Sequence, residues 1–323
     1  MKLYNDLSKV PELNLKGRGD DWFWLNLTDP LPAQFKRLGK KLGIHGLAIE
    51  DSLEFGQRAK FDDYGDYGLL VFHGANGEGL EEVHFYIGKG GLVTVSKEIV
   101  PALEKAYGRL KDHPERYPFP LYELLDSLVD EFRPLLDGLS DQIDELENSI
   151  IESVSREQLT KVFNLKKEIL HLRKTVSPER DLFSSRMDVI LRLSGHDSEA
   201  QHGGTEGEAI DAEHYLRDVA DSLIRISDLL NDYHDMASGC ADLYLATQAN
   251  KQGEISKQLT IVASICLPAS VLTGLYGINF AYFDSHFLNH EWTWWIFGAA
   301  FPLLLAGGMV YWFKRRGWLK SSM

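Results

Sequence analysis

The sequence predicts an α+β domain, built of a mixed or antiparallel sheet with helices, followed by long α-helices and two transmembrane helices. Three observations predict it. Strand-like runs fall within the first 115 residues, a helical apolar stripe begins at Leu121, and two long uncharged runs lie near the end. We expect three parts: a cytosolic α/β domain over 1–115, a cytosolic helical stalk over 116–258, and two membrane helices over 259–323.

Four short segments of the first part are predicted strands, because apolar and β-branched residues fill them and turn residues bound them. They are residues 21–27, 68–72, 83–87 and 91–95. Residues 31–42 follow Pro30 and form the clearest predicted helix of this part.

Apolar residues recur three and four apart after this domain, as they do in packed helices. The stripe comprises Leu121, Leu125, Leu128, Phe132, Leu135, Leu139, Ile143, Leu146 and Ile150. Pro134 inside it is a candidate kink. A second helix is predicted over 156–193 with a bend at Pro178, and residues 194–208 form a predicted turn.

A third helix is predicted from Ala209 to Gly277, with no proline before Pro268. Its stripe is again three-four: Leu216, Val219, Leu223, Ile226, Leu230, Tyr233, Ala237, Cys240 and Tyr244. Unbroken, it would be roughly 100 Å long at 1.5 Å per residue. One subunit cannot bury such a rod, so we expect several copies bundled around an axis.

The two uncharged runs are long enough to cross a membrane. Leu259–Gly277 has 19 residues and Trp292–Phe313 has 22, and 19 helical residues rise about 28 Å. The mean hydropathy of −0.22 excludes a protein made mostly of spans. Lys and Arg flank both runs but are missing from residues 278–291. The positive-inside rule then places both termini in the cytoplasm, and we see no signal peptide.

Charge and motifs exclude several classes of function. A net charge of −14 argues against a nucleic-acid partner and suits a protein that attracts cations, although most acidic surfaces are merely solvated. Cys240 and Cys266 are spaced for neither a disulfide framework nor a zinc cluster, so we assign them packing roles. No P-loop, nucleophile elbow or His-Glu-x-x-His is present, so we expect neither an enzyme nor a covalent cofactor.

The first predicted span ends in Tyr276-Gly277-Ile278-Asn279-Phe280. Backbone carbonyls and the Asn279 amide at a helix end offer oxygen ligands to a hydrated cation at a pore mouth. On its own, this pattern is better explained by Asn279 capping the end of the helix, as Asn often does at a C-terminus. The location at the end of a membrane span favours an ion-conducting protein.

Separated motifs of this chain resemble the CorA-type divalent-cation transporters. In the membrane part they are residues 259–261, 267–268, 274–280 and 316–319, and in the first domain 24–27, 49–51, 57–60, 66–67 and 92–95. The resemblance spans nearly the whole chain. It implies a homopentamer with a funnel-shaped cytosolic domain, in which the first span lines the pore and Gly277, Ile278 and Asn279 form the selectivity filter.

The chain departs from the family pattern at the filter and in the loop after it. Magnesium channels of the family usually carry Gly-Met-Asn, where this chain has Ile278, and a Met-Pro-Glu-Leu stretch is absent. These changes resemble the zinc-transporting, ZntB-like branch. Imidazole and carboxylate groups of the loop suit zinc, although a solvated loop explains them as well. The residues are Asp284, His286, His290 and Glu291.

The family register also implies a pore-facing stripe below the filter: Ser256, Leu259, Ala263, Leu267, Ser270 and Gly274. Leu259 and Leu267 would form apolar rings that gate by dewetting, whereas leucine on a helix face is ordinarily packing. Asp218 matches a position where the family places a regulatory metal carboxylate between subunits. The plainer interpretation of Asp218 is a surface acid beside Arg217.

The sequence thus favours a divalent-cation channel of the inner membrane, passive or proton-coupled, with zinc slightly ahead of magnesium, cobalt or nickel. The expected partners are further copies of the chain, the lipid bilayer and the transported cation. A membrane-anchored metal sensor is the competing class, because tethering spans need neither a Gly-x-Asn nor a polar stripe. Mutating Asn279 would separate the two classes: a loss of transport would favour the channel, and no effect would favour the sensor.

Overall fold

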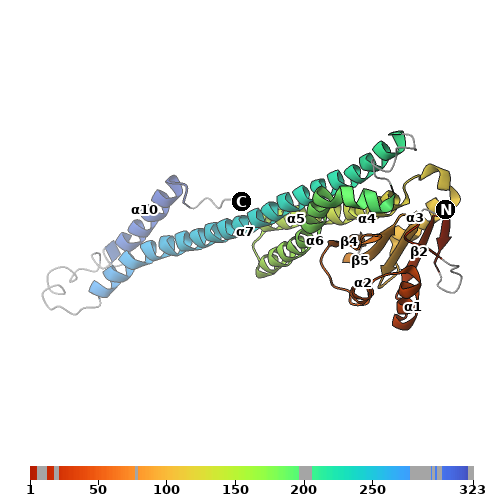
Figure 1. The fold of residues 1–323 in the computed structure, drawn as a ribbon. Helices are drawn as coiled ribbons and strands as arrows, with labels where there is room; N and C mark the ends of the chain where they lie inside the picture. Colours follow the sequence, from red (N-terminus) through yellow and green to blue (C-terminus); the bar gives the residue numbers. More distant parts are fainter. Residues whose placement is uncertain are drawn as a thin grey trace. The chain divides into compact units, whose positions relative to one another are not determined.

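The computed structural model describes residues 1–5, 13–17, 22–76, 79–195, 206–276, 292, 295–296 and 300–318. The chain forms two compact units, Met1–Ala241 and Asp242–Met323. Helix α7 contributes residues to both (Figure 1). The predicted division at residues 115 and 258 stays a prediction.

A six-stranded mixed sheet forms the centre of the first unit, as predicted. Its strands are β1 (Lys2–Tyr4), β2 (Phe23–Thr28), β3 (Lys60–Asp63), β4 (Tyr67–Asn76), β5 (Gly79–Gly88) and β6 (Gly91–Ser96). Their order in space is β1-β2-β6-β5-β4-β3. β2 pairs in parallel with β1 and β6, and the other pairs are antiparallel. The parallel β2–β6 pairing arises because the β4–β5–β6 meander returns to the first part of the chain.

Helices α1 (Pro32–Leu42) and α2 (Gly46–Asp51) cover one face of the sheet (Figure 1). Alternate residues of β2 join Phe35 of α1 in one buried cluster, because successive side chains of a strand point to opposite faces. α1 has Pro32 in its first turn, where a missing N–H costs nothing, and ends at Gly43 with φ 71°.

The opposite face carries α3 (Pro101–Asp112), the short 3-10 turn η2 (Pro114–Arg116), α4 (Pro120–Asp130) and the two helices that follow α4 in the chain. Trp24 of β2 stacks obliquely on Tyr107 of α3 and donates a hydrogen bond from Nε1 to Thr94 Oγ1 at 2.9 Å. Gly74 of β4 has no side chain because a Cβ there would lie 2.5 Å from Leu128 Cδ2 of α4. This close approach fixes α4 against the sheet.

The stripe that begins at Leu121 forms two helices rather than one. α4 ends at Asp130 and α5 (Phe132–Glu152) begins two residues later, so the break lies before Pro134. This break is the interruption predicted at Pro134: proline has no N–H to donate to the Asp130 carbonyl four residues back, and in an unbroken helix its ring would clash with that carbonyl. α6 (Arg156–Ser194) opens with a Ser155–Gln158 capping box and continues through Pro178.

The third long helix is α7 (Glu206–Tyr276), close to the predicted span of residues 209–277. Within Ala212–Gly274 it contains a segment long and apolar enough to cross a membrane, the one such helix among the described residues. Of the second uncharged run, the structure describes α10 (Phe301–Arg315) together with a few residues before it. A second span, and the side of the membrane on which each end lies, stay predictions.

Candidate ion pathway along helix α7

The predicted pore-facing stripe lies on one exposed face of α7. Its members follow each other three or four residues apart, so they share a helix face. Each is exposed in the single chain: Ser256, Leu259, Ala263, Leu267, Ser270 and Gly274. Leu259 and Leu267 keep 69% and 65% of their surface exposed. Leucines this exposed are expected to contact lipid or further copies of the chain.

A row of aspartates precedes this stripe at seven-residue spacing. In the first unit, Asp221, Asp228 and Asp235 of α7 are exposed. In the second unit Asp242 is exposed, and the same spacing leads through Ala249 to Ser256, Ala263 and Ser270, which are all exposed. Residues seven apart stay on one helix face with a drift of about 20° per heptad. We call these four residues the aspartate row; the spacing was readable in the sequence, but our prediction missed it.

Hydroxyl groups of the apolar part of α7 are satisfied within the helix. Ser270 Oγ donates to the Cys266 carbonyl at 2.9 Å, and Thr260 Oγ1 donates to the Ser256 carbonyl at 2.8 Å. A hydroxyl that donates to its own helix can lie in an apolar environment and still accept a hydrogen bond. Ser270 can therefore offer an oxygen lone pair to water that accompanies a cation.

The filter and the loop after it lie outside the described residues, which end in this region at Tyr276. The roles of Gly277, Ile278 and Asn279, and of Asp284, His286, His290 and Glu291, therefore stay predictions. Among the residues that the structure does describe, no group of three or more His, Cys, Asp or Glu side chains is placed to hold a metal ion.

Asp218 lies where α7 meets α4. Tyr122 Oη donates a hydrogen bond to Asp218 Oδ2 at 3.1 Å, and the Tyr122 ring lies against Tyr215. Burial, and then the negative charges of Asp130 and Asp218, raise the pKa of Asp126 to about 6. A concentration of negative charge surrounds Asp218 within one chain, and its regulatory metal role stays a prediction.

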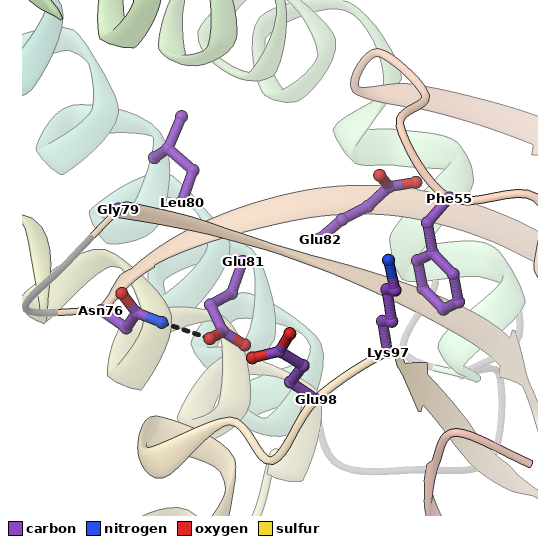
Figure 2. Close-up of a pocket in the computed structure, with 8 residues that line it drawn as sticks. All are labelled: Phe55, Asn76, Gly79, Leu80, Glu81, Glu82, Lys97 and Glu98. Atoms are coloured by element: carbon purple, nitrogen blue, oxygen red, sulfur yellow. Dashed lines mark hydrogen bonds between the residues drawn. The ribbon is translucent and has the colours of Figure 1, made fainter.

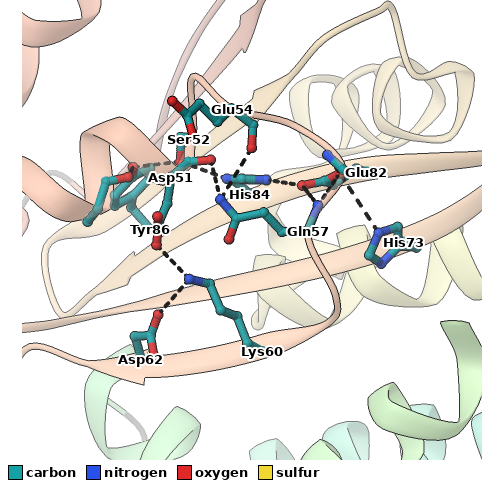
Figure 3. A network of polar contacts seen from close by, with 12 residues as sticks. Asp51, Ser52, Glu54, Gln57, Lys60, Asp62, His73, Glu82, His84 and Tyr86 are labelled. Carbon is teal, nitrogen blue, oxygen red and sulfur yellow. Dashed lines mark hydrogen bonds and ion pairs between the residues drawn. The ribbon is translucent and has the colours of Figure 1, made fainter.

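A buried polar network, missed by sequence reasoning, ties α6 to the sheet. The carboxylate of Glu179 (α6) accepts hydrogen bonds from the His73 backbone N–H at 2.6 Å and contacts His73 Nδ1 at 3.2 Å. The carboxylate of Glu82 contacts both His73 and His84 (Figure 3): Oε1 lies 2.6 Å from His84 Nε2, and Oε2 lies 4.0 Å from His73 Nε2. His84 Nδ1 contacts Ser52 Oγ at 2.7 Å. The one sequence signal for this network was Glu82-x-His84, two polar residues that point to the same face of a strand.

Glu179 and His73 form a buried carboxyl–imidazole pair. Burial raises the pKa of Glu179, and its second oxygen, Oε2, has no hydrogen-bond partner among the described residues. Burial alone would lower the pKa of His73, but the hydrogen bond and charge of Glu179 and the charge of Glu82 raise it above the ordinary 6.5. Because the raised pKa of His73 makes the folded state bind that proton more tightly than the unfolded state does, the stabilisation from His73 is complete below the ordinary histidine pKa and is lost as pH rises above it.

We expect Glu179→Gln to lower the free energy of unfolding by about 1–3 kcal/mol near pH 6, because glutamine keeps an acceptor but loses the charge. The decline in stability of the wild type as the pH rises above the ordinary histidine pKa should become shallower in this variant. Urea unfolding of the full-length protein in detergent measures both effects. Glu168→Gln, which changes an exposed acid of the same helix, is the control. Equal pH slopes in wild type and Glu179→Gln would contradict a His73 pKa raised by Glu179.

An acidic pocket of about 340 Å³ opens beside this network (Figure 2). Glu81, Glu82 and Glu98 line it together with Lys97, and the Asn76 amide donates a hydrogen bond to Glu81. Burial, and then the charge of Glu98, raise the pKa of Glu81. The pocket contains none of the predicted site residues.

Comparisons with known proteins match almost the whole length of the chain. The family described as CorA-like Mg2+ transporter protein matches residues 19–315. The cobalt/magnesium transport protein CorA of Thermotoga maritima is 30% identical over 314 residues, covering 92% of this chain and 83% of that protein. The zinc transport protein ZntB of Cronobacter sakazakii is 25% identical over 306 residues, covering 92% and 88%.

A solved structure shows the fold. The CorA magnesium transporter of Methanocaldococcus jannaschii matches with a TM-score of 0.75 at 22% identity, covering 92% of this chain and 91% of that one. Together these matches define a class, the membrane transporters of divalent metal cations. The chain belongs to the CorA family of that class, which confirms the resemblance seen in its motifs.

Proposed function

We propose that this protein conducts zinc across the inner membrane, along a path lined by α7 from several copies of the chain. The observation that carries this proposal is the exposed stripe of α7 from Ser256 to Gly274, whose members lie three or four residues apart and so share one helix face. Continued by one more step, the spacing reaches Gly277. A hydrated cation would be recognised at Gly277, Ile278 and Asn279.

The exposed face supports an assembly around an axis. One α7 cannot enclose a path, and a seven-residue repeat is the spacing at which neighbouring helices supercoil. The family resemblance implies five copies in a funnel. In such a ring each aspartate would be repeated at its own level, which raises the local concentration of cations.

Zinc is proposed ahead of magnesium because of the filter and the loop. Ile278 replaces the methionine that magnesium channels of the family usually carry, and the loop combines histidines with carboxylates. Zinc transport by the relative from Cronobacter sakazakii supports this choice. Transport of magnesium, cobalt or nickel is the alternative, supported by the more similar protein from Thermotoga maritima.

The basic end of α10 supports cytoplasmic termini. Lys314 and Arg315 lie in its last turn, and the guanidinium of Arg316 lies over the Trp312 ring, 4.7 Å from its centre. Cations and aromatic rings at a helix end are typical of the cytoplasmic interface of a membrane. The predicted outer loop, residues 278–291, has no Lys or Arg. The proposed transport forms and breaks no covalent bond and uses no covalently bound cofactor.

Ion flux into liposomes that contain the purified protein tests the function. We expect zinc to enter faster than magnesium at equal concentrations and equal membrane potential, with protein-free liposomes as the control. Faster magnesium entry would place the chain with the magnesium transporters and make Ile278 a tolerated variant. Absence of flux for either ion would favour the membrane-anchored sensor.

A further inference from the structure

The outward face of α6 is basic along its first half. Residues directly opposite the buried side of the helix follow a 4-3-4-3-4 spacing and are all exposed: Arg156, Thr160, Phe163, Lys167, Leu170 and Lys174. Phe163 and Leu170 keep 61% and 40% of their surface exposed. We call these six residues the basic face of α6. It contains no acid, although the chain as a whole carries a net charge of −14.

The outward face of α5 has the opposite charge. Its members follow a 4-3-4-3 spacing, are all exposed and lie opposite the buried side of that helix: Asp137, Asp141, Asp144, Asn148 and Ile151. Ile151 keeps 60% of its surface exposed. We call these five residues the acidic face of α5. α5 and α6 pack against each other in the first unit, so one pair of helices presents both faces (Figure 1).

Neither face has an ion-pair partner among the residues that the structure describes. Over the part of the chain that the structure describes, ion pairs within 4.0 Å form at many other sites, including Arg109 with Glu123 and Arg217 with Glu213. The charged members of the two faces take part in none. Two exposed rows of unpaired charge, each with large apolar residues between the charges, are typical of surfaces that contact a partner.

We propose that the basic face of α6 packs against the acidic face of α5 in a neighbouring copy of the chain. This inference rests on the assembly of several copies proposed above. Both faces have the three-four spacing at which two helices interlock at a small angle. The contact joins two different patches of one chain, and such a contact closes into a ring when repeated around an axis.

A second copy explains the two faces better than a lipid surface does. An anionic bilayer would attract the basic face of α6 but would repel the acidic face of α5 on the same pair of helices. A neighbouring copy provides opposite charge for both faces through one kind of contact, and that contact brings Phe163 and Leu170 toward Ile151. Complementary charge would then select the correct neighbour and the correct register.

Charge reversal tests the proposal in the full-length protein purified in detergent. Lys167→Glu/Lys174→Glu and Asp141→Lys/Asp144→Lys should each raise the dissociated fraction about tenfold, as expected when close interfacial charge pairs become like-charged. The variant with all four substitutions should return toward the wild-type value, because the pairs are restored with reversed sign. Mass photometry at a series of dilutions measures the dissociated fraction.

Lys161→Glu/Lys166→Glu is the matched control, because it makes the same charge change on α6 away from the basic face. Unchanged assembly in both reversed pairs would overturn the proposal, and so would a fourfold variant that dissociates as readily as either pair. An effect of the α6 reversal without one from α5 would indicate another anionic partner, such as lipid, and would also overturn it. The wild type, measured alongside, separates this result from a failure of the proposed assembly, since a monomeric wild type would refute the assembly itself.

Discussion

Replacing Asn279 with alanine is expected to lower divalent-cation flux through the reconstituted protein at least about tenfold. In the proposed pore, one amide from each copy would accept or donate hydrogen bonds to the water around the ion. A hydrogen bond to a charged group contributes about 1.5–3 kcal/mol, and 1.4 kcal/mol is already tenfold in a rate or an equilibrium constant. Because every copy around the pore carries the substitution, the free-energy losses from the individual amides add together.

Asn289→Ala is the control for this variant. It makes the same chemical change in the predicted outer loop, ten residues beyond the filter. We expect its flux to remain near the wild-type value, and the zinc-to-magnesium ratio to be unchanged. Equal losses in the two variants would show that the loop as a whole matters, and wild-type flux in Asn279→Ala would remove the filter role from Gly-x-Asn.

The sequence predicted the elements whose pattern is local. β4, β5 and β6 are apolar runs separated by glycine turns, and α1 begins after a proline. β3 was missed because its residues, Lys60-Phe61-Asp62-Asp63, show no apolar alternation. It is a strand because β4 supplies the partner, a contact that local sequence does not carry.

Helix breaks were harder to predict than helices. The apolar stripe passes from Leu128 to Phe132 at helical spacing, so periodicity cannot reveal that α4 ends at Asp130. Pro134 was the sequence signal for this break, which lies three residues before the proline because Pro134 cannot donate a hydrogen bond to the Asp130 carbonyl. Conversely, Pro178 lies well inside α6 without ending it.

The sequence likewise predicted one part of the candidate site and missed another part. The pore-facing stripe came from the family register, and the structure describes all six of its residues as exposed. The buried network did not follow, because Ser52, His73, Glu82 and Glu179 come from four separate elements and meet only in the fold. Polar residues at such positions look like surface residues until their burial is known.

Chemical accessibility of α7 separates the proposed pore face from its other faces. Ser256→Cys and Ala263→Cys place a thiol on the stripe, in a background in which Cys240 and Cys266 are alanine. Ile255→Cys and Val262→Cys are matched controls: they are exposed to 59% and 58% in the single chain, yet lie about 100° around the helix from their neighbours. Exposure in the single chain therefore does not distinguish the stripe pair from the control pair. If a water-filled path runs along the stripe, only the stripe pair will be accessible from water in the assembled protein.

Charged thiol reagents added to liposomes that contain these variants provide the most direct measurement of the central claim. Reaction at Ser256→Cys and Ala263→Cys should stop most of the cation flux, because the added group would block the path in every copy. Ile255→Cys and Val262→Cys should keep their flux, because lipid or a neighbouring helix would cover their thiols. Block from both pairs alike, or from the control pair alone, would contradict a cation path along this face of α7.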